Sequence, residues 1–365
     1  MFAERIAVVG TGLIGGSVAM GLRSADPSLE VTGFDHDDAA LEEASRRGAL
    51  TVAATSPADA VEGADVVVVA VPVDRVGESC RELLPGLGDD AAVTDVGSAK
   101  SRVVEEAQAV MGGRFVGGHP MAGSERHGMS AADPRLFDGA WWILTPTAQT
   151  TSAAYARVSS MVGLLGATPI ALSPEIHDDL VARVSHVPQL TASALVEMAG
   201  ASADRETLLG LAAAGFRDVT RIAASHPGLW AGIIKSNHEA VLDALGRLRD
   251  ELGSVGRLIK AQRWEELEAF LEGARRARLE VFAKPDFGGE PIALWMMVPD
   301  RPGVLAEVTT AAGRLGANIE DLRIVHSTEG GRGRLELVIA GADRAQELTD
   351  ALTEAGYLVE WGSPE

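Results

Sequence analysis

The 365-residue sequence has little cysteine and no long apolar run. Cys80 is the single cysteine, which excludes an internal disulfide framework and a thiolate metal cluster and is typical of a reducing cytosol. No apolar stretch approaches the roughly 20 residues that a membrane-spanning helix needs. The chain enters the apolar residues 6–9 almost at once, without a basic leader, so we expect a cytoplasmic protein with no export signal.

Basic charge is also scarce. The sequence has 32 lysines and arginines against 52 aspartates and glutamates, a formal net charge of −20. Nucleic-acid binding needs a basic face, so this balance argues against a nucleic-acid partner. The same charge would repel an anionic substrate, so we expect arginines to concentrate positive potential at any site that binds one. The length predicts two or three domains, each with its own core.

A glycine-rich turn stands near the N-terminus, between an expected strand and an expected helix. The apolar residues 6–9 lead into Gly10-Thr11-Gly12-Leu13-Ile14-Gly15, and a second expected strand over 31–35 ends in Asp35. Glycines at these positions permit a tight turn and a close approach of a pyrophosphate, whose charge rests on the helix N-terminus. Asp35 would bind the adenosine ribose and repel a 2′-phosphate. We therefore expect NAD rather than NADP.

Further apolar runs predict the other strands of a parallel, doubly wound sheet of the Rossmann type. These runs cover residues 65–71, 92–95, 115–118 and 141–145. Val71 and Pro72 follow the first of them, and Ser98 and Lys100 follow the second. Open α/β sheets bind their ligands at the carboxyl ends of strands, so we place both turns at the cofactor crevice.

Residues 117–125, Gly-Gly-His-Pro-Met-Ala-Gly-Ser-Glu, organise the rest of the sequence. Glycine before His119 and proline after it favour a rigid, extended loop over a helix. Histidine titrates near neutral pH, so an imidazole fixed at a strand end is a natural proton acceptor. The sequence therefore predicts that His119 carries the chemistry.

From Ser173 onward the pattern becomes almost purely helical. Serine as the N-cap, Pro174 in the first helical position and Glu175 in the first turn predict a helix start. His186 and Gln189 lie three residues apart on one expected helical face, and Pro188 between them should kink that helix.

A charged cluster and an apolar seam follow. Arg217, Asp218 and Arg221 are spaced to meet on one helix, and Trp230 comes shortly after them. Past Pro227 one long helix is expected. Its apolar residues alternate in spacing between four and three and are Val241, Leu245, Leu248, Leu252, Val255 and Ile259. This spacing predicts packing against another helix, in the same chain or in a second subunit.

Residues 284–291, with proline, aspartate and glycines, form the clearest linker. Beyond it the pattern predicts a βαββαβ module of ferredoxin-like order. Its elements are expected over residues 292–298, 303–315, 319–326, 334–339, 344–355 and 357–361. The module has no cluster of acids, bases or nucleophiles, so we interpret it as a binding or regulatory unit.

Together the motifs resemble those of the prephenate dehydrogenase family with a C-terminal ACT domain, over essentially the whole chain. The matching motifs are the glycine turn with Asp35, Asp95-Val96-Gly97-Ser98-Ala99-Lys100, residues 117–125, Ser185-His186-Val187-Pro188, Thr220-Arg221-Ile222-Ala223 with Trp230, Asp300-Arg301-Pro302-Gly303-Val304-Leu305 and Gly316-Ala317-Asn318-Ile319. Several motifs together in the right order are far more specific than any one of them. The resemblance implies an NAD-binding domain over 1–172, a helical substrate and dimerisation domain over 173–284 and an ACT domain over 291–365. It also implies NAD as cofactor, no metal and a homodimer.

The resemblance further implies roles for single residues. His119 would take the 4-hydroxyl proton of prephenate, Ser98 would bond the same hydroxyl, and His186 would line the nicotinamide pocket. Arg221 would bind a substrate carboxylate. The other substrate-binding candidates are Gln189, Trp230, Arg217, Glu125 and Asp218, of which Glu125 and Asp218 could pair with Arg221 in the empty site. The effector-binding candidates are Asp300, Pro302, Gly303, Val304, Leu305, Asn318 and Ile319, with tyrosine as the first effector and phenylalanine as the second.

Alternatives stay open. Some family members have a histidine where this chain has Gln189, which leaves the choice between prephenate and its amino analogue arogenate undecided. A β-hydroxyacid dehydrogenase would share the plan but typically uses a lysine from its helical domain. A non-catalytic sensor of NAD and amino acids is a third possibility, against which the presence of Ser98, His119, His186 and Arg221 argues.

Overall fold

The computed structural model describes residues 4–123, 126–201, 212–281, 291–299, 304–317, 319–326 and 332–362. The chain divides into two compact units, Met1–Gly253 and Ser254–Glu365, and each is described by itself. The expected linker over 284–291 lies almost wholly outside the described residues. The three-domain division stays a prediction.

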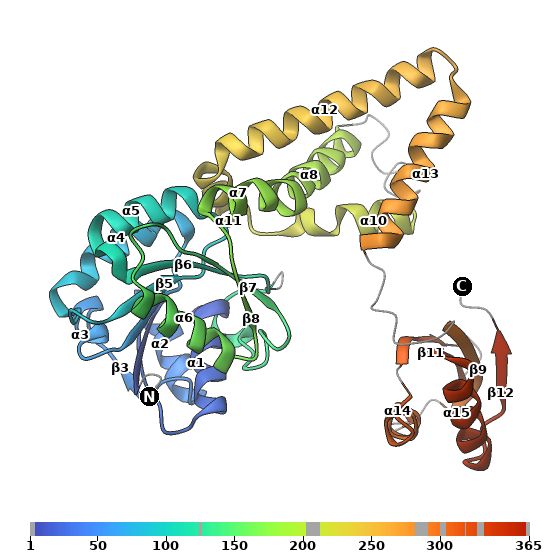
Figure 1. Cartoon of the computed structure of the whole chain (residues 1–365), viewed down its shortest axis with the longest axis horizontal. Coiled ribbons are helices and arrows are strands. Elements are labelled where there is room, and N and C mark those ends of the chain that lie inside the picture. The colour runs from blue at the N-terminus through green and yellow to red at the C-terminus, as the bar shows by residue number, and fades with distance from the viewer. Residues whose placement is uncertain are drawn as a thin grey trace. The chain divides into compact units, whose positions relative to one another are not determined.

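The N-terminal unit contains an eight-stranded sheet in the order β3-β2-β1-β4-β5-β6-β7-β8 (Figure 1). Its strands are β1 (Arg5–Val9), β2 (Glu30–Phe34), β3 (Val52–Ala53), β4 (Val66–Val69), β5 (Ala92–Asp95), β6 (Phe115–Pro120), β7 (Trp141–Thr145) and β8 (Thr168–Ala171). The first six pair in parallel, as the apolar runs predict for all of them except β3, which no predicted run covers. The order reverses between β1 and β4, so the carboxyl ends of these two strands flank the point where such sheets bind ligands.

The expected parallel continuation is wrong at β7, which pairs antiparallel with β6. A parallel return needs a long crossover, usually a helix. The described part of the connection between β6 and β7 contains only the short turn η4 (Met129–Ala131), whereas a full helix links β7 to the parallel β8.

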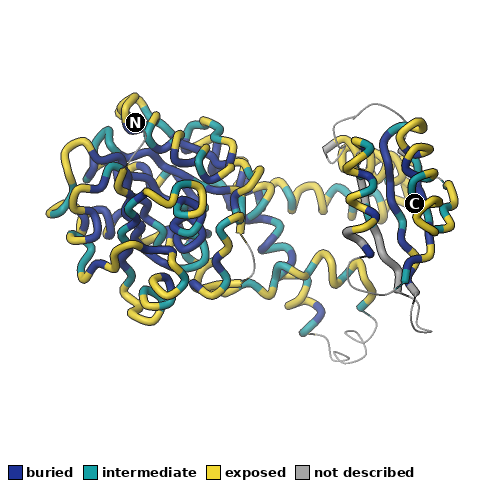
Figure 2. Tube along the Cα trace, turned by 90° about the horizontal axis from the view of Figure 1, so that it is seen from below, coloured by how far each residue is buried: buried dark blue, intermediate teal, exposed yellow. Residues whose placement is uncertain are grey.

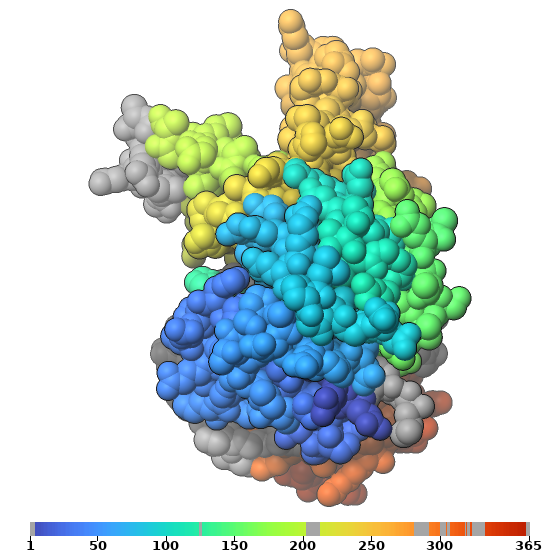
Figure 3. Space-filling view, turned by 90° about the vertical axis from the view of Figure 1, so that its left-hand side faces the viewer, coloured from blue at the N-terminus to red at the C-terminus, as the bar shows by residue number. Residues whose placement is uncertain are grey.

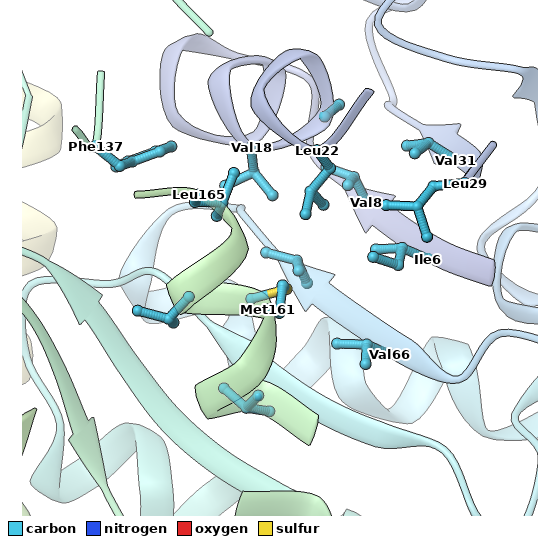
Figure 4. Packing of buried hydrophobic residues seen from close by; sticks show 14 of the residues in the cluster. Ile6, Val8, Val18, Leu22, Leu29, Val31, Val66, Phe137, Met161 and Leu165 are labelled. Atoms are coloured by element: carbon cyan, nitrogen blue, oxygen red, sulfur yellow. The ribbon is translucent and has the colours of Figure 1, made fainter. Parts of the chain in front are cut away.

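Helices cover both faces of the sheet. They are α1 (Leu13–Ala25), α2 (Asp38–Arg46), α3 (Pro57–Val61), α4 (Val76–Leu83), α5 (Ser101–Met111) and α6 (Ser152–Leu164), with the short turns η1 (Val73–Arg75), η2 (Leu84–Gly86) and η3 (Gly112–Arg114). Successive residues of a strand face opposite sides of the sheet and pack in different cores. Val8 and Val66 join α1 and α6 on one face (Figure 4), and Val9 and Val67 join α3, α4 and α5 on the other. The strands are therefore buried on both sides (Figure 2).

Cys80 of α4 lies in the second of these cores and is fully buried. Burial, together with the nearby charge of Asp95, raises the pKa of its thiol to about 12. Figure 3 shows the N-terminal part of the chain, coloured blue to cyan, as one continuous surface.

The helical part of this unit contains α7 (Pro174–Val181), the π-helical segment η5 (Ala182–His186), α8 (Val187–Gly200), α10 (Ala214–Thr220), η6 (Arg221–Ala224), α11 (Pro227–Ser236) and α12 (His238–Lys260), the last of which extends into the second unit. Ser173 caps α7 as predicted, with its Oγ accepting from the amide of Ile176 at 3.2 Å. The kink expected at Pro188 stays a prediction, and the structure has a π-helical segment just before this proline. Proline donates no amide hydrogen to the preceding turn, which can therefore widen.

The long helix expected past Pro227 is α12, which carries every residue of the predicted apolar seam; Asn237 separates it from the shorter α11. The seam itself is divided. Val241 is buried and Leu245 and Leu248 pack against the same small core, whereas Leu252 and Ile259 are exposed. Among the described residues, no helix is both long and apolar enough to cross a membrane.

The second unit contains α13 (Trp264–Val281) and a four-stranded antiparallel sheet in the order β10-β11-β9-β12. Its elements are β9 (Pro291–Pro299), α14 (Val304–Arg314), β10 (Ile319–His326), β11 (Arg332–Ala340), α15 (Ala342–Glu354) and β12 (Val359–Gly362). The element order and the sheet order are those of the split βαβ arrangement that the sequence predicts. Leu294, Leu337 and Leu348 form part of the core between this sheet and its helices.

Candidate active site

The glycine turn between β1 and α1 is tightly packed on the protein side and open on the other. Gly10 has φ +97°, and a Cβ there would lie 2.4 Å from the carbonyl oxygen of Ala70, while a Cβ on Gly15 would lie 1.9 Å from that of Gly10. A Cβ on Gly12 would meet no described atom within 4 Å. Gly12 also precedes α1 without a side-chain cap, which leaves the first amides of the helix for an anion.

Asp35 lies beside this turn at the end of β2. Its Oδ2 accepts hydrogen bonds from the Thr11 amide at 2.6 Å and from Thr11 Oγ1 at 3.1 Å. Its Oδ1 accepts from the amide of Asp37 at 2.9 Å. The carboxylate is thus fixed next to the open helix end, where a dinucleotide's ribose would lie. Val71 and Pro72 follow β4, the strand next to β1, so this group of residues fits the cofactor that the sequence predicts.

A buried ion pair joins the turn after β5 to the end of β6. Lys100 Nζ contacts Asp95 Oδ2 and donates to the carbonyl oxygen of Gly118 at 2.8 Å. Asp95 accepts from the amides of Gly97 at 2.8 Å and Gly118 at 3.0 Å. Both charged side chains are fully buried, and burial lowers the pKa of Lys100 against the opposing effect of Asp95. The pair therefore fixes Ser98, which is half-buried on the β5 turn, relative to the strand that carries His119.

His119 stands at the carboxyl end of β6, as predicted. Its Nδ1 lies 2.8 Å from Nε2 of His177, and the two rings meet edge to face with their centroids 5.1 Å apart. Burial holds the pKa of His119 well below its usual value, and the nearby His177, Lys100 and His186 act in the same direction. The imidazole is therefore neutral at neutral pH and able to accept a proton.

The partner of His119 belongs to a pair that sequence analysis missed. His177 Nδ1 lies 2.9 Å from Oδ1 of Asp178, and Asp178 accepts from the amides of Lys100 at 2.7 Å and Ser101 at 2.8 Å, at the start of α5. Burial opposes the charge on Asp178, but hydrogen bonds from His177 and Ser101 lower its pKa below the usual value. A signal was present in the sequence. The buried positions of α7 are Pro174, His177, Asp178 and Val181, so two titratable residues occupy the apolar face of that helix.

His186 and Gln189 are both buried, as expected of one helical face. Asn237 Nδ2 donates to the carbonyl oxygen of Asp178 at 2.9 Å and also lies 3.2 Å from Nδ1 of His186. The His186 proton must therefore sit on Nε2, which is buried without a partner among the described residues, as is Oε1 of Gln189. Burial lowers the pKa of His186 to about 4. Buried polar atoms are nearly always paired, so this donor and this acceptor are available to a ligand.

The structure brings only some of the other predicted substrate-binding side chains close to the residues above. The Trp230 ring lies edge to face with the His186 ring, with their centroids 6.0 Å apart. Arg221 begins η6, which contacts α8, and its side chain is exposed, as are those of Arg217 and Asp218 on α10. Arg217 Nε donates to the carbonyl oxygen of Ala212 at 3.2 Å. Glu125, and with it the proposed pairing to Arg221, lies outside the described residues. Within the described ranges no group of three or more His, Cys, Asp or Glu residues could hold a metal ion.

Comparison with known proteins shows the family. A family model described as prephenate dehydrogenase, nucleotide-binding domain, matches residues 18–171, and one described as prephenate dehydrogenase, dimerization domain, matches residues 173–273. The prephenate dehydrogenase of Bacillus subtilis is 32% identical over 360 residues, which cover 96% of this chain and 97% of that protein. The chain belongs to the prephenate dehydrogenase family.

Solved members of the prephenate dehydrogenase family share the fold. The enzyme of A. aeolicus, in complex with hydroxyphenyl propionate and NAD+, is 33% identical with a TM-score of 0.73, covering 76% of this chain and 98% of that chain. Synechocystis arogenate dehydrogenase is 31% identical with a TM-score of 0.68, covering 76% and 99%. About a quarter of the present chain therefore has no counterpart in either structure.

Proposed function

We propose that this protein is an NAD-dependent prephenate dehydrogenase, which converts prephenate to 4-hydroxyphenylpyruvate and carbon dioxide in tyrosine biosynthesis. The observation that carries the proposal is the neutral imidazole of His119 at the carboxyl end of β6, in a sheet whose glycine turn, open helix end and Asp35 fit a dinucleotide. Relatives of the same name over nearly the full length support it.

The chemistry divides between cofactor and protein. Prephenate is a cyclohexadiene with a ring carboxylate and a 4-hydroxyl group. The bound nicotinamide supplies the acceptor for the hydride that leaves C4. His119 takes the hydroxyl proton as the carbonyl forms, and Ser98 hydrogen-bonds the same oxygen. Loss of the ring carboxylate as carbon dioxide then makes the ring aromatic, and the proton returns to the phenolic oxygen. Aromatisation drives the last step, so the protein's main tasks are positioning and proton transfer.

Substrate binding is assigned to the helical segment. Arg221 would hold a substrate carboxylate through its guanidinium, with Arg217 and Asp218 nearby in sequence and Trp230 beside His186. The unpartnered Oε1 of Gln189 would accept a hydrogen bond from the ligand. That acceptor also suits the ammonium group of arogenate, which keeps arogenate dehydrogenase as the second candidate.

Assembly and regulation form a further part of the proposal. The dimerization-domain match over 173–273 and the exposed apolar side chains Leu242 and Leu252 on α12 and Phe270 and Leu271 on α13 support a homodimer.

The C-terminal βαββαβ module would be an ACT domain that binds tyrosine or phenylalanine. Of its predicted effector residues, Val304 and Ile319 begin α14 and β10, and Leu305 lies in α14. Asp300, Pro302, Gly303 and Asn318 lie outside the described residues.

One assay tests the activity. NAD reduction is followed by near-ultraviolet absorbance with prephenate, arogenate and 3-hydroxyisobutyrate in parallel. We expect turnover of prephenate, and arogenate as the sole good substrate would favour the second candidate. Turnover of 3-hydroxyisobutyrate alone would refute the family activity, and turnover of none of the three would favour a non-catalytic sensor.

His119→Asn tests the assignment of the base. We expect kcat to fall by roughly 10²–10⁴, the usual contribution of a general base, with the KM values for NAD and prephenate little changed. Near-normal turnover in this variant would show that another group takes the proton.

A further inference from the structure

Three side chains from two elements form one hydrogen-bonded row that ends at the proton acceptor. The row runs from Asp178 to His177 on α7 and from His177 to His119 on β6, over distances of 2.9 and 2.8 Å. His177 and Asp178 are no more than 4% exposed. The row lies entirely within the N-terminal unit, and nothing in the family resemblance assigns a role to His177 or Asp178.

The hydrogens in this row can be placed by elimination. Asp178 accepts two backbone amide hydrogens, so its carboxylate is ionised and acts only as an acceptor. His177 must therefore donate its Nδ1 hydrogen to Asp178, because two acceptors would otherwise face each other. A neutral His177 then has a lone pair on Nε2, and His119 must donate its own Nδ1 hydrogen to it. The one nitrogen of His119 left as an acceptor is Nε2.

We propose that His177 and Asp178 are positioning residues that hold His119 in the tautomer with hydrogen on Nδ1 and a lone pair on Nε2. This deepens the proposed function, on which it rests for the identity of the proton that His119 accepts. When Nε2 takes the substrate's hydroxyl proton, His119 becomes a cation whose Nδ1 hydrogen still points at His177. The fixed carboxylate of Asp178 then lies two hydrogen bonds away and stabilises that positive charge.

The charges around the row are consistent with this arrangement. His119 faces His177 from α7, Lys100 from the β5 turn and His186 from η5, and all three disfavour the protonated resting form. His177 faces Lys100, Asp178 and Asp95, and the two carboxylates partly offset the effect of burial. His119 is therefore unprotonated at rest, and within the part of the chain that the structure describes His177 connects it to the carboxylate of Asp178.

The matched pair His177→Gln and His177→Asn tests the proposal. Glutamine can place an amide oxygen where Nε2 stands and its nitrogen toward Asp178, so it keeps an acceptor for His119. Asparagine is one carbon shorter and leaves His119 Nδ1 without that acceptor. We expect kcat to stay within about fivefold for glutamine and to fall about 100-fold or more for asparagine, with little change in the KM values for NAD and prephenate. Loss of the orienting carboxylate in serine protease triads costs about 10⁴ in kcat for the same tautomeric reason.

A direct measurement of the tautomer needs no substrate. In the ¹⁵N NMR spectrum of histidine-labelled wild-type protein at about pH 8, where these histidines are neutral, we expect Nδ1 of His119 to carry hydrogen and Nε2 to be unprotonated. His119→Gln identifies the resonances. A neutral His119 with hydrogen on Nε2, or equal kcat values in the folded His177→Gln and His177→Asn variants, would overturn the proposal. Absence of prephenate turnover in the wild type would instead refute the proposed function and leave the tautomer measurement to decide this one.

Discussion

Three histidines, His119, His177 and His186, lie at one end of the sheet, and burial lowers the pKa of each. A histidine whose pKa is lower in the folded state than in the unfolded chain favours folding in its neutral form. Its contribution to stability is complete above the unfolded pKa of 6.5 and is lost as the pH falls toward the folded pKa. For His186 the two values are 6.5 and about 4, and this difference corresponds to about 3 kcal/mol.

The free energy of unfolding should therefore fall between pH 7 and pH 5, and urea titrations at several pH values measure it. His177 and His119 change in the same direction, so the total loss should exceed that of His186 alone. In His186→Gln, which removes one titrating group, the dependence on pH should be shallower. A wild-type unfolding free energy that stays constant over this range would contradict the neutral, buried state of these rings.

Arg221→Ala should act on substrate binding. Arg221 is exposed in the free protein, and its pair with a substrate carboxylate would be desolvated only when substrate binds. Removing one partner of such a pair costs about 2–5 kcal/mol, so the KM for prephenate should rise at least about tenfold while the KM for NAD stays the same. Arg183→Ala is the control, because Arg183 is exposed and pairs with Asp179 on the surface. A change confined to the NAD constant would show that Arg221 has been misassigned.

For single residues, the sequence predicts a functional role where the neighbouring residues in the chain indicate one. His119 stands between glycine and proline, and Asp35 follows a strand at the right distance from the glycines. His177 and Asp178 lack such local marks, because their role depends on contacts with residues 58 and 78 positions away. The sequence places Lys100 in a turn, but its complete burial against Asp95 depends on how β5 and β6 pair.

The element that best shows sequence dictating structure is the turn from β1 into α1. Gly12→Ala should fold normally, since its Cβ would meet no described atom within 4 Å. The added methyl group would, however, stand where the pyrophosphate approaches, so the KM for NAD should rise at least about tenfold.

Gly15→Ala is the matched variant and should fail differently. Its Cβ would lie 1.9 Å from the Gly10 carbonyl oxygen, so the turn itself must shift and the melting temperature should fall. Melting temperatures and NAD titrations of the two proteins separate a binding defect from a folding defect. Equal melting temperatures for the two variants would contradict this packing.

The sequence predicts those helices and strands whose structure is determined by their own residues. Apolar runs, glycines and caps predict β1, β2, β4, β5, β6, α7 and the βαββαβ module to within a few residues, but not the two-residue strand β3. The sequence could not predict that β7 pairs antiparallel with β6. Strand direction follows from the type of connection, and the described part of the connection between β6 and β7 contains only the short turn η4. Nor could the sequence predict the end of α11 at Asn237, whose side chain is held by Asp178 and His186 from another helix.

For the whole molecule, the two prephenate dehydrogenase family models end at residue 273, before the C-terminal βαββαβ module. The A. aeolicus structure is covered over 98% of its length by only 76% of this chain. A chain truncated after Lys284 should therefore keep its dehydrogenase activity and lose its response to tyrosine, with coupling of about 1–3 kcal/mol in the full-length protein. Inhibition curves for the two proteins measure this. Equal inhibition would indicate competition at the active site instead.

Cys80 is the single cysteine and is buried, which makes it practical to follow the coupling between the effector and the active site with introduced labels. Its thiol is fully enclosed and its pKa is raised to about 12, so it forms almost no thiolate at neutral pH and reacts poorly with maleimides. The natural protein therefore serves as its own cysteine-free background. Cysteines introduced at exposed positions such as Glu42 on α2 and Leu358 near β12 would take fluorophores or spin labels selectively. Distances between labelled helices and the C-terminal sheet could then be followed in solution as effector is added, with every other residue left as nature has it.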